Sequence, residues 1–148
     1  MADKNIVSNR QARFNYAILE SLEAGIALTG TEVKSIRLGN ISLNESFARV
    51  DGTEIFVYNM HIAPYEFGNI NNTDSMRPRK LLLHKSQIRK LSAETSAKNL
   101  ALIPLKVYFK NGLVKMELAL AKGKKLYDKR ESIKRRDSQR EISRKVAR

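Results

Sequence analysis

The chain of 148 residues contains no cysteine and no tryptophan. Without cysteine it has neither a disulfide framework nor a thiolate-bound metal ion. No apolar run approaches the roughly 18 residues that a membrane-spanning helix requires, and the first residues lack the apolar stretch of a signal peptide. We therefore expect a cytoplasmic protein, because no segment directs it elsewhere.

Acidic residues are few compared with basic ones. The 28 Lys and Arg residues outnumber the 15 Asp and Glu residues, which gives a formal net charge of +13. Such an excess favours a polyanionic partner, either nucleic acid or an anionic membrane surface. The membrane is the weaker candidate, because the basic C-terminal segment lacks the Trp, Phe and Leu face of an interfacial helix.

Most of the excess charge lies in residues 122–148. They hold 12 basic and four acidic residues, a net charge of +8, whereas residues 1–121 carry +5. A segment so charged and so poor in large apolar side chains cannot offset an ordering entropy of roughly 1–2 kcal/mol per residue. We expect this tail to be disordered in the free protein. A solvated tail that only improves solubility is the alternative interpretation.

The same tail carries helix signals. Asp128 and Glu131 have the spacing of a capping box. Glu131–Arg135 and Glu141–Lys145 are acid–base pairs four residues apart, each of which favours a helix by about 0.2–0.5 kcal/mol. An isolated helix of this length is nevertheless marginal in water. The sequence therefore predicts a tail that becomes helical when it binds RNA.

Near the N-terminus, the first predicted helix follows a segment that could be either a strand or a helix. Residues 13–28 have apolar side chains at even positions, as in a strand, but also a helix-forming composition, and we favour a strand. After them, Thr31 is a candidate N-cap and Gly39 a candidate stop for a short helix. Lys34 and Arg37 share the outer face of this helix, which gives it a basic side.

Two β-hairpins are predicted further along. Asp51-Gly52 separates two strand-like runs, which is a signal for a type I′ turn. Asn111-Gly112 separates two further strand-like runs and predicts a second tight turn. Pro104 marks an edge or a bulge at the start of the second hairpin. The alternation there places one set of apolar side chains on a common face: Leu105, Val107, Phe109, Val114, Met116, Leu118 and Leu120.

Residues 69–78 are polar and rich in turn formers, so they predict a mobile loop. Residues 79–84 form a short element with a basic entry, and residues 85–99 suit a surface helix. With about six strands and two or three short flanking helices, the chain is expected to be mainly β. Its predicted architecture is an OB-like closed antiparallel barrel over residues 1–121, followed by the basic tail of residues 122–148.

No catalytic constellation is present in this sequence. There is no glycine-rich phosphate loop and no His-Glu metal motif, and His61 and His84 are the only imidazoles. The acids near these histidines have no diagnostic spacing. We therefore expect neither an enzyme nor a bound cofactor or metal ion.

Six blocks of residues, in this order and with matching gaps, resemble the SmpB family of tmRNA-binding proteins. They are Gly25-Ile26, Gly30-Thr-Glu-Val-Lys-Ser-Ile-Arg37, His61-Ile-Ala-Pro-Tyr65, Arg79-Lys-Leu-Leu-Leu-His84, Pro104-Leu-Lys-Val-Tyr-Phe-Lys110 and Gly123-Lys-Lys-Leu-Tyr-Asp-Lys-Arg130. The resemblance covers nearly the whole chain.

This resemblance implies a non-enzymatic monomer with an OB-like barrel. Family members bind the tRNA-like domain of tmRNA at its elbow and D-loop, and they support its alanylation by alanyl-tRNA synthetase. Together with elongation factor Tu they deliver tmRNA to ribosomes that have stalled without a codon, the process called trans-translation. The tail then enters the empty mRNA channel of the small subunit as a helix against 16S rRNA.

The resemblance also implies two sets of site residues. The set expected to bind tmRNA is Asn9, Arg10, Glu32, Lys34, Ser35, Arg37, His61, Arg79, Lys80, Leu82, His84, Lys124 and Lys125. The set expected to bind the ribosome is Tyr127, Asp128, Lys129, Arg130, Lys134, Arg135, Arg136, Arg140, Arg144 and Lys145. Tyr127 stands where many members have His, which keeps a stacking ring but loses a titratable donor. A small ribosomal or assembly protein with an OB barrel and an rRNA-binding extension is the alternative.

Overall fold

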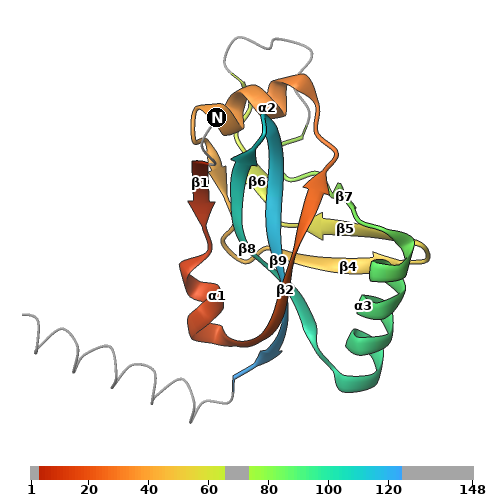
Figure 1. The fold of residues 1–148 in the computed structure, drawn as a ribbon. Helices are drawn as coiled ribbons and strands as arrows, with labels where there is room; N and C mark the ends of the chain where they lie inside the picture. Colours follow the sequence, from red (N-terminus) through yellow and green to blue (C-terminus); the bar gives the residue numbers. More distant parts are fainter. Residues whose placement is uncertain (1–3, 66–73, 125–148) are drawn as a thin grey trace, which may run out of the picture.

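The computed structural model describes residues 4–65 and 74–124 (Figure 1). The first half of the predicted loop over residues 69–78 therefore falls outside the described residues, as does the tail from residue 125 onward. In chain order the described elements are β1 (Lys4–Ser8), α1 (Arg10–Asn15), β2 (Tyr16–Ile26), α2 (Gly30–Arg37), β3 (Ile41–Ser42), β4 (Phe47–Asp51), β5 (Glu54–Tyr58), β6 (His61–Ile62), β7 (Arg79–Leu82), α3 (Lys85–Lys98), β8 (Ala101–Lys110) and β9 (Leu113–Gly123).

Six of these strands close into an antiparallel barrel. Their order around the ring is β8-β4-β5-β7-β2-β9, and β9 pairs with β8 to complete it. β1 adds to the outside of the ring beside β8, and β3 and β6 form a separate two-stranded sheet. The closed mainly-β architecture predicted from the sequence is confirmed. Closure leaves few unpaired strand edges, which are a liability for aggregation.

The two hairpin turns differ in type. Asn111 and Gly112 both have positive φ, 52° and 77°, as a type I′ turn requires, so that prediction is confirmed. The type I′ turn predicted at Asp51-Gly52 was wrong. Asp51 pairs with Glu54, so the turn residues are Gly52 and Thr53, and Gly52 alone of these has positive φ. A glycine at the first central position is the pattern of a type II′ turn.

A bulge in β8 divides the apolar side chains between two cores. The register with β9 shifts between Pro104 and Lys106, which confirms the predicted bulge. Beyond the bulge Val107 points into the barrel, whereas Leu105 belongs to a second cluster with Ile103 on the outer side. The prediction that Leu105 shares a face with Val107 was wrong, because an extra residue in one strand reverses the alternation.

Helix α1 covers this second cluster and was not predicted. Residues 13–15 belong to α1 rather than to a strand, although β2 then continues as expected. Ala12 is the buried residue of α1, and it packs with Ile103 and Leu105. The helix is stabilised by Asn9, whose side chain accepts a hydrogen bond from the Ala12 backbone N–H at 3.3 Å. Six residues are too few to show a helical period in the sequence.

The N-cap of helix α2 lies two residues before the predicted one. Thr29 is the N-cap rather than Thr31: its hydroxyl accepts from the Glu32 N–H, and the Glu32 carboxylate accepts from the Thr29 N–H. This reciprocal capping box requires an acid three residues after the cap, which Thr29 has and Thr31 lacks. Gly39 has a φ of +80° just beyond the helix, as expected of a helix stop.

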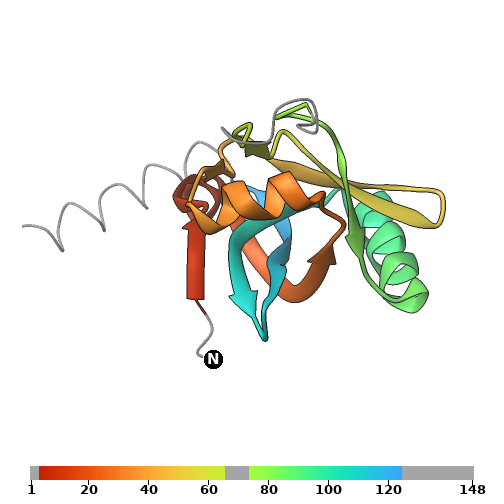
Figure 2. The same ribbon diagram turned by 90° about the horizontal axis from the view of Figure 1, so that it is seen from above.

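The three helices lie at different places around the barrel. Figures 1 and 2 show α2 lying across one end, with α1 and α3 near the opposite end and on opposite sides of it. The surface helix predicted over residues 85–99 is confirmed by α3, which ends at Asn99 in the left-handed conformation. No helix within residues 4–65 and 74–124 has the length and apolar character to cross a membrane.

We predict that Asn9→Ala destabilises the fold by about 1–3 kcal/mol, because it removes three buried hydrogen bonds. Besides capping α1, the Asn9 amide donates to the Leu43 and Pro104 carbonyl oxygens at 3.3 and 3.0 Å. Urea unfolding measures the change. The exposed Asn44→Ala is the matched control and should alter stability little; an equal loss for both variants would contradict the role given to Asn9.

Candidate nucleic-acid interface

The centre of the predicted interface is a buried carboxylate that holds two arginines. Glu32 is 4% exposed, and its Oε2 accepts from Arg79 Nε at 2.6 Å. Its Oε1 accepts from Arg77 Nη2 at 2.5 Å and from the Thr29 backbone N–H at 2.9 Å. The carboxylate therefore joins the first turn of α2 to β7 and to the residues that precede β7.

The guanidinium of Arg79 extends this link to two further segments. Arg79 is fully buried, and besides Glu32 it donates to the carbonyl oxygens of Met60 and Ser75. A buried charge is tolerated only when it is paired and its remaining donors are satisfied. Arg79 meets both conditions, so α2, β7 and the chain around Met60 and Ser75 are fixed relative to one another.

Glu32 and Arg79 together form an ion pair that we call the clamp. Each of the two charges shifts the pKa of the other. Burial on its own would raise the pKa of Glu32, but hydrogen bonds from Arg77, the Thr29 backbone and Arg79 outweigh it and hold the pKa below its usual value of 4.5. Burial lowers the pKa of Arg79, and the hydrogen bond and negative charge of Glu32 oppose that shift. Both groups are therefore charged at neutral pH.

Four residues of the predicted tmRNA-binding set are buried in the structure. They are Asn9, Glu32, Ser35 and Arg79. Asn9 supports α1, and Glu32 and Arg79 form the clamp just described. Ser35 lies on the inner face of α2, and its hydroxyl has no hydrogen-bond partner among residues 4–65 and 74–124. Their side chains face the protein interior.

The exposed members of the set near α2 form a basic and aromatic face. Lys34 and Arg37 are exposed on the outer side of the helix, as predicted from the sequence. The Lys34 Nζ lies 5.4 Å from the centroid of the Tyr65 ring. His61 is exposed on β6, which lies against α2. Cations and an aromatic ring side by side suit phosphate and base contacts.

A second exposed group lies along β7. Lys80 and Leu82 alternate with buried Arg79 and Leu81, so they point outward, and Leu82 is 53% exposed. With His84 they line a shallow groove of about 630 Å³, which also receives Lys85 and Lys115. Lys80 is only loosely paired, with its Nζ 4.0 Å from the Glu54 carboxylate. This group is joined to the α2 face through the Glu32–Arg79 clamp.

The third group lies at the far end of the barrel. Arg10 is exposed on α1, and Figure 1 shows α1 and α2 at opposite ends. Lys124 follows β9, and its backbone N–H donates to the Asn15 carbonyl oxygen at 2.9 Å. Lys125 and every predicted ribosome-binding residue from Tyr127 to Lys145 lie outside the described residues. The structure thus does not gather the predicted residues into one patch.

Residues 6–148 match the family model described as SmpB protein. The chain belongs to the SmpB family. The agreement extends over the clamp, both exposed faces and the tail, so the SmpB resemblance inferred from six short blocks holds for nearly the whole chain.

Individual similar proteins also indicate the SmpB family. The SsrA-binding protein of Pelotomaculum thermopropionicum is 60% identical over 146 residues, which cover 99% of this chain and 95% of that protein. The SsrA-binding protein of Enterococcus faecalis is 56% identical over 141 residues, covering 95% and 92%. A solved structure described as "tmRNA-SmpB: a journey to the center of the bacterial ribosome" is 49% identical, with a TM-score of 0.69 and coverage of 86% and 93%.

The candidate interface also includes residues that were not predicted from the sequence. Arg77 shares the Glu32 carboxylate, and Tyr65 lies beside Lys34. Lys85 and Lys115 line the β7 groove from α3 and β9. Arg77 was detectable in the sequence as part of the basic run before β7. The position of Lys115 beside the β7 groove depends instead on the pairing of β2 with β9. Within residues 4–65 and 74–124, no group of three or more His, Asp or Glu could hold a metal ion.

We predict that Glu32→Gln lowers the free energy of unfolding by about 3 kcal/mol at pH 7, because it leaves the buried Arg79 charge uncompensated. Glu54→Gln is the control, since Glu54 is 48% exposed and its pairing with Lys80 is worth less than about 1 kcal/mol. Denaturant unfolding of both variants measures the difference. Equal losses would show that the clamp does not stabilise the fold.

The same variant should change the dependence of stability on pH. Because the folded pKa of Glu32 is depressed, its contribution is present above the usual value of 4.5 and is lost as the pH falls below that value. We therefore expect the stability gap between wild type and Glu32→Gln to narrow in acid. A gap that stays constant between pH 7 and pH 3 would contradict the depressed pKa.

Proposed function

We propose that this protein binds tmRNA and works in trans-translation, where it brings tmRNA to stalled ribosomes. The observation that carries the proposal is the basic face of α2, which a buried ion pair fixes in place in a chain of the SmpB family. A rigid, positively charged surface is what recognition of a folded RNA requires, because phosphate contacts set the register and orientation of the RNA.

The described part of the chain is assigned to the tRNA-like domain of tmRNA. Lys34, Arg37 and His61 at the α2 end, and Lys80 and His84 along β7, are exposed and can reach phosphates and bases. Leu82 offers an apolar contact to a sugar or a base. The buried members of the predicted set act by position: Glu32 and Arg79 hold the α2 face and the β7 face in register.

The tail is assigned to the ribosome. Residues 125–148 would bind 16S rRNA in the empty mRNA channel of the small subunit and would become helical there. Because folding is coupled to binding, the tail would fold only on ribosomes whose channel holds no mRNA. Alanyl-tRNA synthetase and elongation factor Tu would then meet this protein only through tmRNA. The protein acts as a cytoplasmic monomer and is not an enzyme in this proposal.

We predict that Lys34→Ala and Lys80→Ala each reduce the salt dependence of tmRNA binding. Losing one phosphate contact lowers the slope of log K against log salt concentration by about one. Lys98→Ala is the control, because Lys98 lies at the end of α3 and pairs with Glu94 at 2.9 Å. Filter binding over a range of salt concentrations gives the slopes, and an unchanged slope for Lys34→Ala would place that lysine off the RNA.

We predict that a chain ending at Lys124 keeps most of its affinity for tmRNA but fails to support tagging on stalled ribosomes. The cut is made after Lys124 rather than at the predicted boundary between residues 121 and 122, because β9 continues to Gly123 and pairs there with Tyr16. Gel-shift assays measure the first property and peptide tagging in a reconstituted translation system measures the second. Loss of tmRNA affinity as complete as the loss of tagging would contradict the division between barrel and tail.

A further inference from the structure

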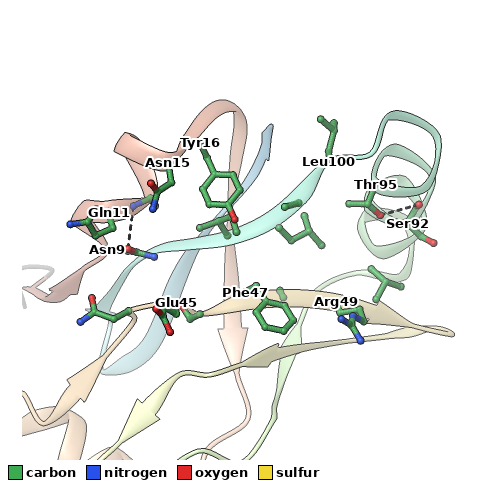
Figure 3. Close-up of a pocket in the computed structure, with 18 of the residues that line it drawn as sticks. Asn9, Gln11, Asn15, Tyr16, Glu45, Phe47, Arg49, Ser92, Thr95 and Leu100 are labelled. Carbon is green, nitrogen blue, oxygen red and sulfur yellow. Dashed lines mark hydrogen bonds between the residues drawn. The ribbon is translucent and has the colours of Figure 1, made fainter. Parts of the chain in front are cut away.

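A wide groove lies at the end of the barrel away from α2, beyond the α2 face and the β7 group. Of the described residues in the predicted tmRNA-binding set, the buried Asn9 alone lines it. It has a volume of about 1080 Å³, and its walls come from α1, β4 and α3, with β8 along its floor. Figure 3 shows Gln11, Asn15 and Tyr16 on one side, Phe47 on a second and Thr95 on a third, around a common space. The volume is near the upper limit of about 300–1,000 Å³ for sites that bind small molecules.

The rim of the groove carries neutral hydrogen-bonding groups, together with the exposed carboxylate of Glu45. Gln11 and Asn15 of α1 offer side-chain amides, and Ser92, Thr95 and Ser96 of α3 offer hydroxyls. Amides and hydroxyls both donate and accept, which matches the mixed donor and acceptor edges of nucleobases. The Thr95 hydroxyl donates to the Leu91 carbonyl oxygen at 2.9 Å, and its lone pairs are still able to accept.

The β4 wall provides an aromatic surface with a cation. Phe47 and Tyr58 stack with ring centroids 5.4 Å apart and an interplanar angle of 18°. The Arg49 guanidinium lies 5.6 Å from the Phe47 centroid and 5.8 Å from that of Tyr58. Phe47 and Arg49 both line the groove. A half-buried ring and a planar guanidinium are the two groups on which unpaired bases stack in RNA-binding proteins.

The groove adjoins the start of the basic tail. Asn15, in its wall, accepts a hydrogen bond from the Lys124 N–H, and Tyr16 pairs with Gly123. The next residues, 125–148, hold ten basic and four acidic residues, a net charge of +6. Lys124, the last described residue, therefore lies beside this groove, whereas α2 lies at the other end of the barrel (Figure 1).

We propose that this groove binds unpaired nucleotides of ribosomal RNA. The inference rests on the proposed function, in which the tail lies on the ribosome. The amide and hydroxyl rim would pair with base edges, the Phe47 and Arg49 wall would stack on a base, and the neighbouring tail would follow the phosphates. The groove would thus recognise exposed bases, whereas the tail would recognise mainly the charge of the phosphates.

The test uses the full-length chain with isolated small ribosomal subunits and, separately, with tmRNA. Ser96→Leu fills the α3 side of the groove, and Gln11→Leu blocks the α1 side. Ala97→Leu is the matched control, because Ala97 is exposed on the same helix next to Ser96 but does not line the groove. Dimethyl sulfate, which modifies unpaired adenine and cytosine, reports which bases each protein covers.

We expect wild type and Ala97→Leu to protect the same unpaired rRNA bases, and Ser96→Leu and Gln11→Leu to lose part of that protection. Both groove variants should bind the small subunit about tenfold more weakly, since stacking of one base is worth roughly 5- to 150-fold. The slope of binding against salt should stay as in wild type, because stacking releases no counterions. Affinity for tmRNA should also be unchanged.

Three results would overturn the proposal. The first is equal rRNA protection by wild type and both groove variants, as would be found if another segment of the chain filled the groove. The second is a lost protection that lies in tmRNA rather than in rRNA. The third is an equal loss of binding for Ala97→Leu. A wild-type chain that binds neither tmRNA nor the subunit would instead contradict the proposed function itself.

Discussion

The structure depends on the buried ion pair between Glu32 and Arg79. A carboxylate and a guanidinium without water around them must satisfy each other, and here they do so across three segments that are far apart in the sequence. The same carboxylate caps α2 and holds the half-exposed Arg77. One interaction therefore sets where α2 lies on the barrel, and with it the direction in which Lys34 and Arg37 point.

This arrangement separates the exposed residues that we propose contact RNA from the buried residues that position them. The predicted tmRNA-binding set contains both kinds, and burial divides them: Glu32, Ser35 and Arg79 face inward, whereas Lys34 and Arg37 face outward. A substitution at an inward position would then weaken RNA binding without removing any contact to RNA. We propose that the two ends of the barrel have different partners: the tRNA-like domain at the α2 end and ribosomal RNA at the α1–α3 end.

Local patterns predicted the elements that local chemistry determines. The Asn111-Gly112 turn, the stop at Gly39 and the helix over residues 85–99 depend on neighbours in the chain, and the structure confirms each. The missed features depend on distant neighbours. Helix α1 has one buried residue, Ala12, and that burial exists only because the bulge in β8 turns Leu105 outward. The clamp joins Glu32 to Arg79 across 47 positions, a distance over which a single sequence gives no spacing rule.

The resemblance to the SmpB family named the residues expected to matter, but it did not say how they act. The most direct measurement is NMR of the protein labelled with ¹⁵N-arginine, in which the Nε–H of Arg79 reports its bond to Glu32. If the ion pair is a fixed support for α2, Arg79 gives one slowly exchanging Nε–H signal that is lost in Glu32→Gln and persists, little shifted, when tmRNA is added. A signal that disappears on adding tmRNA would show that the pair opens to contact the RNA, and would contradict the account.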